Sequence, residues 1–312
     1  MGSRPVPDGR CVRVFRSIAT GASAVSACPP RNPLPQAGGG VSAALATAAA
    51  RLTFSATPRL DAELLMAHAL GVERNAILLD PDRYTVPDTF AAFVDRRLNH
   101  EPIAYITGSR GFWSIDLAVG PGALVPRADS ETLLIAAQAH FAGRAPATIL
   151  DLGTGPGTLL LAALDEWPAQ GLGVDYSPQA LAYARANAAT LGMADRAQFI
   201  RSSWASAIVG QFDLILANPP YIATAEQLPS EVHDHEPHAA LFAGADGLDD
   251  YRILAEQLPA LIAPGGAAVI EIGSTQAAPV TALLEAQGLH VALHHDYGGN
   301  ARALVATHAP AT

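Results

Sequence analysis

Two hydrophobic patterns alternate along the second half of the chain. Short apolar runs, typical of buried strands, recur between segments whose apolar residues have the spacing of amphipathic helices. The runs that predict strands are 148–152, 172–175, 197–200, 212–217, 267–272, 290–295 and 303–307. The segments that predict helices are about 157–166, 178–191, 248–262 and 276–287. Strands that alternate with helices form parallel sheets, so we expect a doubly wound α/β domain with seven strands.

The segment from residue 41 to about 100 has a purely helical pattern. Residues 41–52 are rich in alanine, and Thr57-Pro58 predicts an N-cap followed by a proline at the first helical position. Gly71 predicts the end of that helix, and a later helix is expected from Pro87 to about Asn99. The side chains expected on buried faces are Leu60, Leu64, Leu65, Phe90, Phe93, Val94 and Leu98.

Residues 1–40 differ from the rest of the chain in composition. They are rich in Arg, Ser, Pro and Gly and contain both cysteines, Cys11 and Cys28. We expect a disordered N-terminal extension; an organelle transit peptide is the alternative, because such peptides are Arg-rich and poor in acids. Two cysteines in a tail make neither a disulfide framework nor a zinc site, which fits a reducing cytoplasm.

Composition excludes several classes of function. Half of the 312 residues are hydrophobic, yet no apolar run is long enough to span a bilayer, so we expect a soluble protein without membrane contact. All 19 basic residues are arginine, which excludes Schiff-base lysines and the phosphate lysine of P-loops. The net charge of −10 disfavours direct binding of nucleic acid through its phosphates.

A glycine-rich loop follows the first strand of the α/β region. The sequence Asp151-Leu152-Gly153-Thr154-Gly155-Pro156-Gly157 leads into a helix, and such loops approach NAD, FAD or S-adenosylmethionine closely. Pro156 disfavours a pyrophosphate, because it removes a backbone N–H from the turn. Asp175 ends the second strand, where an acid accepts hydrogen bonds from ribose hydroxyls, and Trp204 after the third strand could flank an adenine ring.

The most specific motif is Asn218-Pro219-Pro220-Tyr221, directly after the strand 212–217. The two prolines make a rigid, extended exit without N–H groups. The side-chain oxygen of Asn218 and the carbonyl of Pro219 can then accept both hydrogens of a planar –NH2 group, whose face Tyr221 can cover. Two such acceptors raise the nucleophilicity of an amide nitrogen and stabilise the positive charge that develops as it attacks a sulfonium methyl.

From about residue 41 to 308 the chain resembles the release-factor glutamine methyltransferases, the PrmC or HemK family. Besides the glycine loop and residues 218–222, the matching segments are 101–108, 112–113, 124–127 with Asp129 and Glu131, 236–237, 240–241, 246–248, 251–252, 271–273 with Gln276, Asp296, Gly298 and Arg302. The resemblance implies a helical substrate-recognition domain at 41–105, a hairpin linker at 106–146 and a Rossmann-like methyltransferase domain at 147–312.

The resemblance also implies the reaction. The methyl donor would be S-adenosylmethionine, and the acceptor would be the side-chain amide of the glutamine in the Gly-Gly-Gln motif of class 1 peptide chain release factors. The residues that would contact the donor are Gly153, Thr154, Gly155, Pro156, Gly157, Asp175, Trp204 and Asn218. Asn218, Pro219, Pro220 and Tyr221 would hold the glutamine. Ser203 departs from the family, which often has an acid there that can bind the adenine amine, and Ala128 replaces a common proline.

Other interpretations stay open at this point. The same acceptor motif serves exocyclic amines of nucleic-acid bases, and a ribosomal-protein glutamine is another possible substrate. A non-catalytic nucleotide-binding scaffold and an NAD enzyme are further alternatives. The intact acceptor motif makes both less favoured. His233, His235 and His238 are close in sequence, but we interpret them as a solvated loop and expect no metal site. Arg127 is expected either to guide a protein substrate or to form a surface ion pair.

Overall fold

The computed structural model describes residues 40–309. The extension expected at 1–40 therefore lies outside the described residues, apart from Gly40, and so do both cysteines. Within the described range, no helix is long and apolar enough to cross a membrane.

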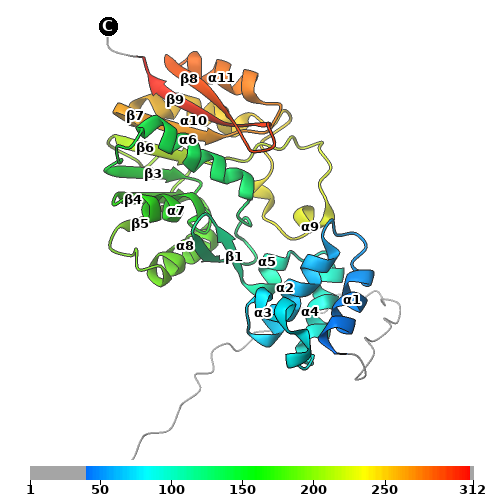
Figure 1. Cartoon of the computed structure of the whole chain (residues 1–312). Helices are drawn as coiled ribbons and strands as arrows, with labels where there is room; N and C mark the ends of the chain where they lie inside the picture. Colours follow the sequence, from blue (N-terminus) through cyan, green and yellow to red (C-terminus); the bar gives the residue numbers. More distant parts are fainter. Residues whose placement is uncertain (1–39, 310–312) are drawn as a thin grey trace, which may run out of the picture. The chain divides into compact units, whose positions relative to one another are not determined.

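Short helices form the N-terminal part of the described chain, as the pattern predicts (Figure 1). They are α1 (Val41–Arg51), α2 (Pro58–Leu70), α3 (Arg74–Leu79), α4 (Thr89–Leu98) and α5 (Ile103–Thr107), with a 3-10 turn at Pro81–Arg83. Leu65, Phe90 and Val94 are buried in the shared core. The prediction for Leu60 is wrong: it remains 37% exposed, because the buried face of α2 is formed by Ala62, Leu65 and Met66 instead.

The ends of α2 differ in how well the sequence predicts them. Gly71 caps the C-terminus in the left-handed conformation, with φ of 64°, as expected of a glycine that follows a helix. At the N-terminus Thr57 occupies the N-cap position without capping the backbone. Its hydroxyl lies 3.3 Å from the Asp61 carboxylate, so the side chain is engaged elsewhere.

Residues 109–118 form a small antiparallel hairpin of β1 (Ser109–Phe112) and β2 (Ile115–Ala118). The hairpin is followed by a helix that is not expected from the sequence, α6 (Glu131–Phe141). Leu133, Leu134 and Phe141 of this helix belong to the core beneath the main sheet. The interval 106–146 thus holds, besides the hairpin, a helix that packs on the sheet.

Seven strands form the main sheet within residues 40–309, in the order β5-β4-β3-β6-β7-β9-β8. The strands are β3 (Thr148–Leu152), β4 (Gln170–Asp175), β5 (Ala197–Arg201), β6 (Phe212–Ala217), β7 (Ile262–Glu271), β8 (Leu289–His295) and β9 (Ala301–His308). The expectation of a parallel sheet fails at β9, which is antiparallel to both β7 and β8. The chain between β8 and β9 holds no helix to cross over the sheet, so the two strands form a hairpin.

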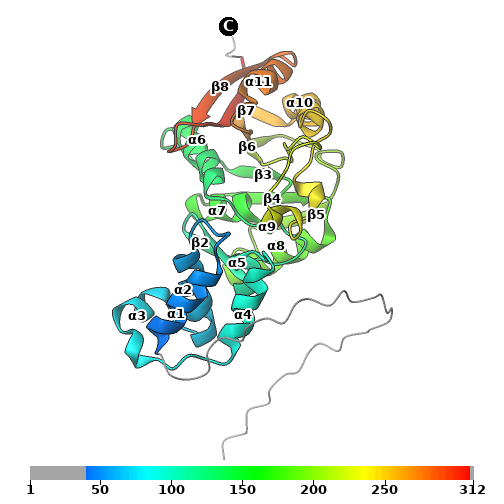
Figure 2. The same ribbon diagram turned by 90° about the vertical axis from the view of Figure 1, so that its right-hand side faces the viewer.

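Helices cover both faces of this sheet (Figures 1 and 2). The helices are α7 (Thr158–Glu166), α8 (Pro178–Thr190), α10 (Asp249–Leu261) and α11 (Ala277–Glu285), together with α6. Ile149 and Leu150 are adjacent in β3, yet each faces a different core: one with α6 and α7, the other with α10 and α11. The central strands are therefore buried on both faces, which explains their continuous apolar runs.

Arg97 of α4 links three segments through its buried guanidinium. Its Nε donates to Asp61 at 2.8 Å, and the side chains of this pair are only 4% and 7% exposed. Its other nitrogens donate to the carbonyl of Glu101 and to Glu231 of α9 (Ser230–His233). Two charges removed from water in this way depend on each other, because either one alone is strongly destabilising.

Replacing Arg97 by Leu is expected to lower the free energy of unfolding by about 3–5 kcal/mol, because the Asp61 carboxylate then stays buried without its counter-charge. Urea unfolding followed by circular dichroism measures this. Arg51→Leu is the matched control: Arg51 pairs with Asp95 in a partly exposed position, where such a pair contributes at most about 1 kcal/mol. Equal losses in the two variants would contradict the dependence on burial.

Candidate functional site

The order of the strands places a crevice at the carboxyl ends of β3 and β6. From β3 the chain continues to β4 and β5 on one side, and it returns to β6 on the other side. Ligands of such sheets bind at this point of reversal, outside the carboxyl ends of the strands. Leu152 of β3 is paired with Ala217 of β6, so the glycine loop and Asn218 leave the sheet next to each other.

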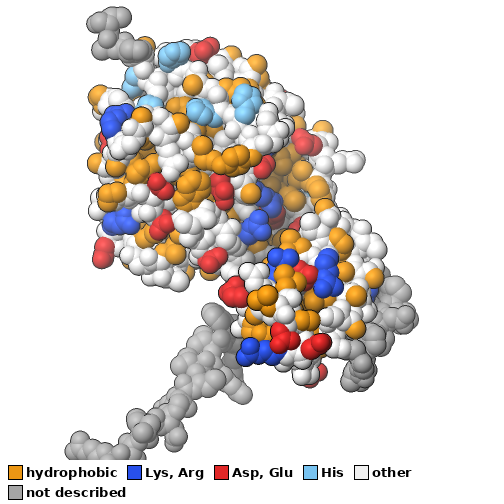
Figure 3. Space-filling view, viewed as in Figure 1, with side chains coloured by type: hydrophobic (Ala, Val, Ile, Leu, Met, Phe, Trp, Pro, Cys, Tyr) orange, Lys and Arg blue, Asp and Glu red, His pale blue; other side chains and the backbone are white. Residues whose placement is uncertain are grey.

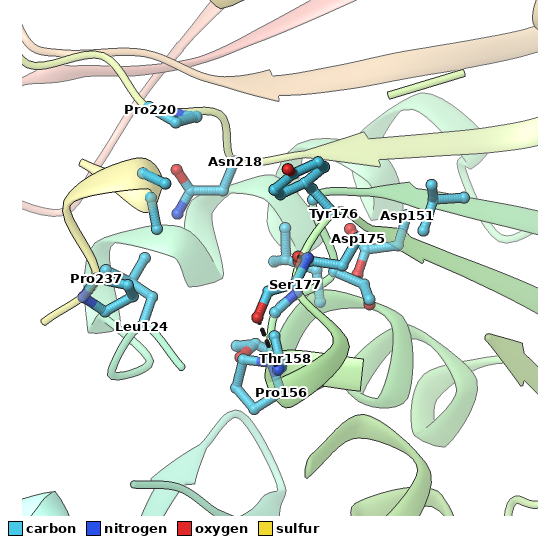
Figure 4. Close-up of a pocket in the computed structure, with 18 of the residues that line it drawn as sticks. Leu124, Asp151, Pro156, Thr158, Asp175, Tyr176, Ser177, Asn218, Pro220 and Pro237 are labelled. Carbon is cyan, nitrogen blue, oxygen red and sulfur yellow. Dashed lines mark hydrogen bonds between the residues drawn. The ribbon is translucent and has the colours of Figure 1, made fainter. Parts of the chain in front are cut away.

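A cavity of about 300 Å³ lies at this position, within the range expected for a small-molecule site (Figure 4). The sequence-predicted residues that line it are Gly153, Thr154, Gly155, Pro156, Asp175, Trp204, Asn218 and Pro220. Gly157, Pro219 and Tyr221 are not among the lining residues. Residues far apart in the sequence therefore converge here, including most of those that the two motifs predict.

The glycine loop has a conformation that other residues would rarely adopt. Gly153 and Gly155 have φ of 77° and 58°. A side chain at Gly153 would also press on the ring of Trp204, since a Cβ there would lie 3.2 Å from it. Gly157, with φ of 89°, is the N-cap of α7 and packs against Leu161. Glycine is therefore required at position 157 because α7 begins there in a tight turn, close to Leu161.

Asp151 is a buried acid with one free oxygen. Its Oδ2 accepts hydrogen bonds from the Thr154 hydroxyl at 2.6 Å and from the backbone N–H of Leu160 at 3.1 Å. Its Oδ1 is the sole buried side-chain polar atom without a partner in the part of the chain that the structure describes. Burial raises the pKa of Asp151 to about 7. The residue lines the cavity, so a cationic or donating ligand there would satisfy this oxygen.

Asp175 is held by the backbone of the loops around it. Its Oδ2 accepts from the N–H of Gly155 and its Oδ1 from the N–H of Ser177, both at 2.8 Å. Burial raises its pKa, although these hydrogen bonds oppose the shift. A carboxylate has further lone pairs, so the group can still accept hydrogen bonds from a ligand. Ser177 also caps α8 by accepting from the N–H of Ala180, as its position before Pro178 predicts.

Trp204 lies over the glycine loop with its indole fixed by an acid. Its Nε1 donates to Asp250 of α10 at 2.9 Å, and its φ of 48° is unusual for a residue other than glycine. Ser203 and Asp250 also line the cavity. No motif in the sequence predicts Asp250 as a site residue. The lining of the cavity thus includes a carboxylate contributed by α10.

Asn218 extends from the end of β6 into the space between Tyr176 on one side and Leu124 and Pro237 on the other (Figure 4). Its Nδ2 donates to the hydroxyl of Ser130 at 3.1 Å. Ser130 in turn donates to Glu271 at the end of β7, at 2.5 Å. Neither Ser130 nor Glu271 is predicted from the sequence as a site residue. Glu271 closes an apolar strand at the same edge of the sheet as Asn218, and this placement is the signal that could have identified it.

Tyr221 and Arg127 have structural partners around the cavity. The Tyr221 carbonyl accepts from Gln276 at 2.9 Å, and burial raises the pKa of its phenol to about 12, so the hydroxyl is protonated at neutral pH. Arg127 lines the cavity and forms an ion pair with Glu236, whose other oxygen accepts from the N–H of Val125. This pair joins the segment before α6 to the loop that follows the acceptor motif.

The three histidines after the acceptor motif have separate partners. His233 bonds the Asp234 carboxylate, His235 bonds the carbonyl of Asn99, and His238 bonds the carbonyl of His233. In the range 40–309, no group of three or more His, Cys, Asp or Glu side chains is arranged to hold a metal ion.

Two family models match the chain: the PrmC N-terminal domain over residues 43–108 and the Methyltransferase small domain over residues 127–236. A solved structure with a similar fold is the 16S rRNA N2 G1207 methyltransferase of T. thermophilus, in complex with AdoMet and guanosine. It is 18% identical with a TM-score of 0.47, covering 64% of this chain and 50% of that one. A likeness this distant bears on neither substrate nor mechanism.

Curated relatives are much more similar. A protein of Rhodospirillum rubrum named release factor glutamine methyltransferase is 47% identical over 256 residues, which are 80% of this chain and 78% of that protein. A protein of Bradyrhizobium diazoefficiens with the same name is 41% identical over 274 residues, 84% of this chain and 92% of that one. Identity at this level over most of both chains places this protein in the release factor glutamine methyltransferase family.

Proposed function

We propose that this protein transfers a methyl group from S-adenosylmethionine to the side-chain amide nitrogen of the glutamine in the Gly-Gly-Gln motif of class 1 peptide chain release factors. The observation that carries the proposal is the position of Asn218, which lines the same cavity as the glycine loop. The names of the relatives support the choice of substrate. Because release factors act in translation, the reaction belongs in the cytoplasm.

The residues of the glycine loop fit the methyl donor. S-adenosylmethionine supplies an electrophilic methyl group on a sulfonium, and it carries an ammonium group as well. Asp151, with its unpartnered Oδ1, is suited to hold a cationic part of it. Asp175 would accept from the ribose hydroxyls, and Trp204 would cover the adenine, with Ser203 and Asp250 beside it. Gly153 and Gly155 would let the backbone approach closely.

The acceptor side requires an oxygen aimed at the amide nitrogen. Asn218 Oδ1 and the Pro219 carbonyl would accept the two N–H hydrogens of the glutamine, and Tyr221 and Pro220 would border the flat group. S-adenosylmethionine would supply the methyl group and keep the electron pair of the broken carbon–sulfur bond on sulfur, while the glutamine nitrogen would form the new bond to carbon and lose one N–H proton to solvent. The two acceptors stabilise the positive charge that the nitrogen gains before this proton is lost.

The nucleic-acid alternative has weaker support. The chain has a net charge of −10, and basic side chains stand singly or in small groups among acidic and apolar ones on the face drawn in Figure 3. Neutralising phosphates calls for a continuous basic surface. A protein acceptor agrees better with this charge distribution, and a ribosomal-protein glutamine remains the second candidate of that kind.

The substrate is tested by incubating a purified class 1 release factor with this protein and S-adenosylmethionine, followed by peptide mass spectrometry. We expect the mass of one methyl group to be added to the peptide that contains Gly-Gly-Gln. A release factor with this glutamine replaced by Asn is the control, because its shorter side chain cannot reach the same place. Methylation of ribosomal proteins or of RNA, with the release factor unmodified, would overturn the proposal.

Asn218→Ala is expected to lower kcat about 10²–10³-fold, because one acceptor of the transition-state charge is lost. Binding of S-adenosylmethionine, measured by calorimetry, should stay close to that of the wild type. Asn300→Ala, an exposed asparagine between β8 and β9, is the matched control and should retain its activity. Turnover near the wild-type value in Asn218→Ala would show that the acceptor oxygen lies elsewhere.

Asp151→Asn is expected to weaken the binding of S-adenosylmethionine about 10–100-fold, because a neutral amide replaces the charged acceptor. The pKa of Asp151 is raised to about 7, so the carboxylate is ionised above that pH and protonated below it. The wild-type dissociation constant should therefore rise as the pH falls from about 8 to 6, while that of the variant stays constant. Asp165→Asn, at the exposed end of α7, should behave as the wild type. A pH-independent wild-type affinity would contradict this role of Asp151.

A further inference from the structure

A carboxamide can present either of two faces to a ligand. Its oxygen accepts hydrogen bonds and its nitrogen donates two, while the two ends have nearly the same size and shape. If the Asn218 side chain turned by 180° about its last bond, N–H groups would meet the N–H groups of the glutamine. The acceptor chemistry therefore needs a device that holds the oxygen toward the cavity.

The structure contains such a device on two neighbouring elements. Ser130, in the 3-10 turn before α6, is 2% exposed, and Glu271, at the end of β7, is 1% exposed. The Ser130 hydroxyl lies 2.5 Å from Glu271 Oε2 and 3.1 Å from the nitrogen of Asn218. A hydroxyl has one hydrogen, and an ionised carboxylate can only accept, so this hydrogen belongs to the bond with Glu271.

The direction of the second bond follows from the first. Once Ser130 donates to Glu271, its oxygen has only lone pairs to offer to Asn218. Asn218 must then turn its nitrogen to Ser130, which leaves its oxygen for the ligand. Because the Ser130 hydroxyl donates its hydrogen bond to Glu271, it can only accept from Asn218 and so selects one of the two carboxamide orientations.

We propose that Ser130 and Glu271 are positioning residues for methyl transfer: together they hold the carboxamide of Asn218 with its oxygen toward the acceptor nitrogen. This inference rests on the proposed function for its consequence in catalysis. The arrangement itself is a property of the protein without substrate, so it can be measured separately.

The arrangement depends on the charge of Glu271. A protonated Glu271 would donate to the oxygen of Ser130, whose own hydrogen would then point to Asn218 and hold its oxygen. The carboxamide would be reversed, with its nitrogen toward the ligand. Burial raises the pKa of Glu271 to about 7, while the hydrogen bond from Ser130 opposes the shift. The other charged or titratable groups that act on Glu271 are Arg302, Asp129, Arg127, Tyr221 and Tyr251.

Turnover is therefore expected to depend on pH. Glu271 is ionised above about pH 7, so kcat of the wild type should be highest there and fall about tenfold per pH unit well below it. S-adenosylmethionine must be saturating at every pH, which keeps the titration of Asp151 out of kcat.

The variants separate positioning from a general loss of structure. Ser130→Ala and Glu271→Gln should lower kcat about tenfold or more at about pH 8 and abolish the fall of kcat at acidic pH, because the first lacks the hydroxyl and the second lacks the charged carboxylate that fixes it. Ser130→Thr keeps the hydroxyl, so this variant should show the wild-type kcat and the wild-type fall of kcat at acidic pH. Asp213→Asn, at the opposite end of β6, is the control for loss of a carboxylate and should keep the wild-type pH profile.

A second measurement does not require turnover. In ¹⁵N-labelled protein, the side-chain NH2 resonances of Asn218, assigned by their absence in Asn218→Ala, should shift with a midpoint near the pKa of Glu271 in the wild type and not in Glu271→Gln. Such a titration in a protein that fails to methylate a release factor would support the arrangement and overturn the proposed substrate. If the wild type methylates a release factor but neither its kcat nor its Asn218 side-chain resonances change with the ionisation of Glu271, the positioning role is overturned and the proposed substrate stands.

Discussion

The pairing of β3 with β6 is the constraint on which the rest of the site depends. Leu152 and Ala217 are opposite each other in this pair, so the two chains leave the sheet at the same level. The glycine loop turns into α7 with a conformation that only glycine adopts easily, while Asn218 continues into a proline-stiffened exit. A slip of the register would separate the two motifs along the sheet, and no rearrangement of side chains could compensate for it.

The sequence predicts the parts of the site that follow strands, and it does so because motifs at strand ends share one edge of a parallel sheet. The glycine loop, Asp175 and Asn218 are of this kind, and the structure brings all of them to one cavity. Ser130 escaped prediction because its role lies in a contact with Glu271, 141 residues away, which no local pattern records, whereas Glu271 left one signal, its position at the end of an apolar strand. The direction of β9 could have been predicted, because the stretch between the runs 290–295 and 303–307 is too short for a crossover helix. The solvent exposure of Leu60 depends on tertiary packing.

Two buried carboxylates at this edge of the sheet have different roles: one offers an oxygen to a ligand, and the other orients a neighbouring side chain. Asp151 and Glu271 are each bonded to a hydroxyl, that of Thr154 and that of Ser130, and burial raises the pKa of both to about 7. Asp151 keeps one oxygen without a partner, where it can meet a cation. Glu271 acts through the hydroxyl it holds and affects the cavity by way of Asn218. The difference lies in what surrounds each acid rather than in its type.

The exit from β6 has a consequence for selectivity between two nearly identical side chains. Pro219 and Pro220 have no N–H to offer, and Asn218 turns its nitrogen away to Ser130. A glutamate that entered in place of glutamine would bring its negative oxygens against lone pairs, with no hydrogen from this stretch of chain to relieve the repulsion. In the proposed role of this segment, the strand end would distinguish amide from acid because it offers no donor, and a glutamate formed by hydrolysis of the glutamine would bind poorly.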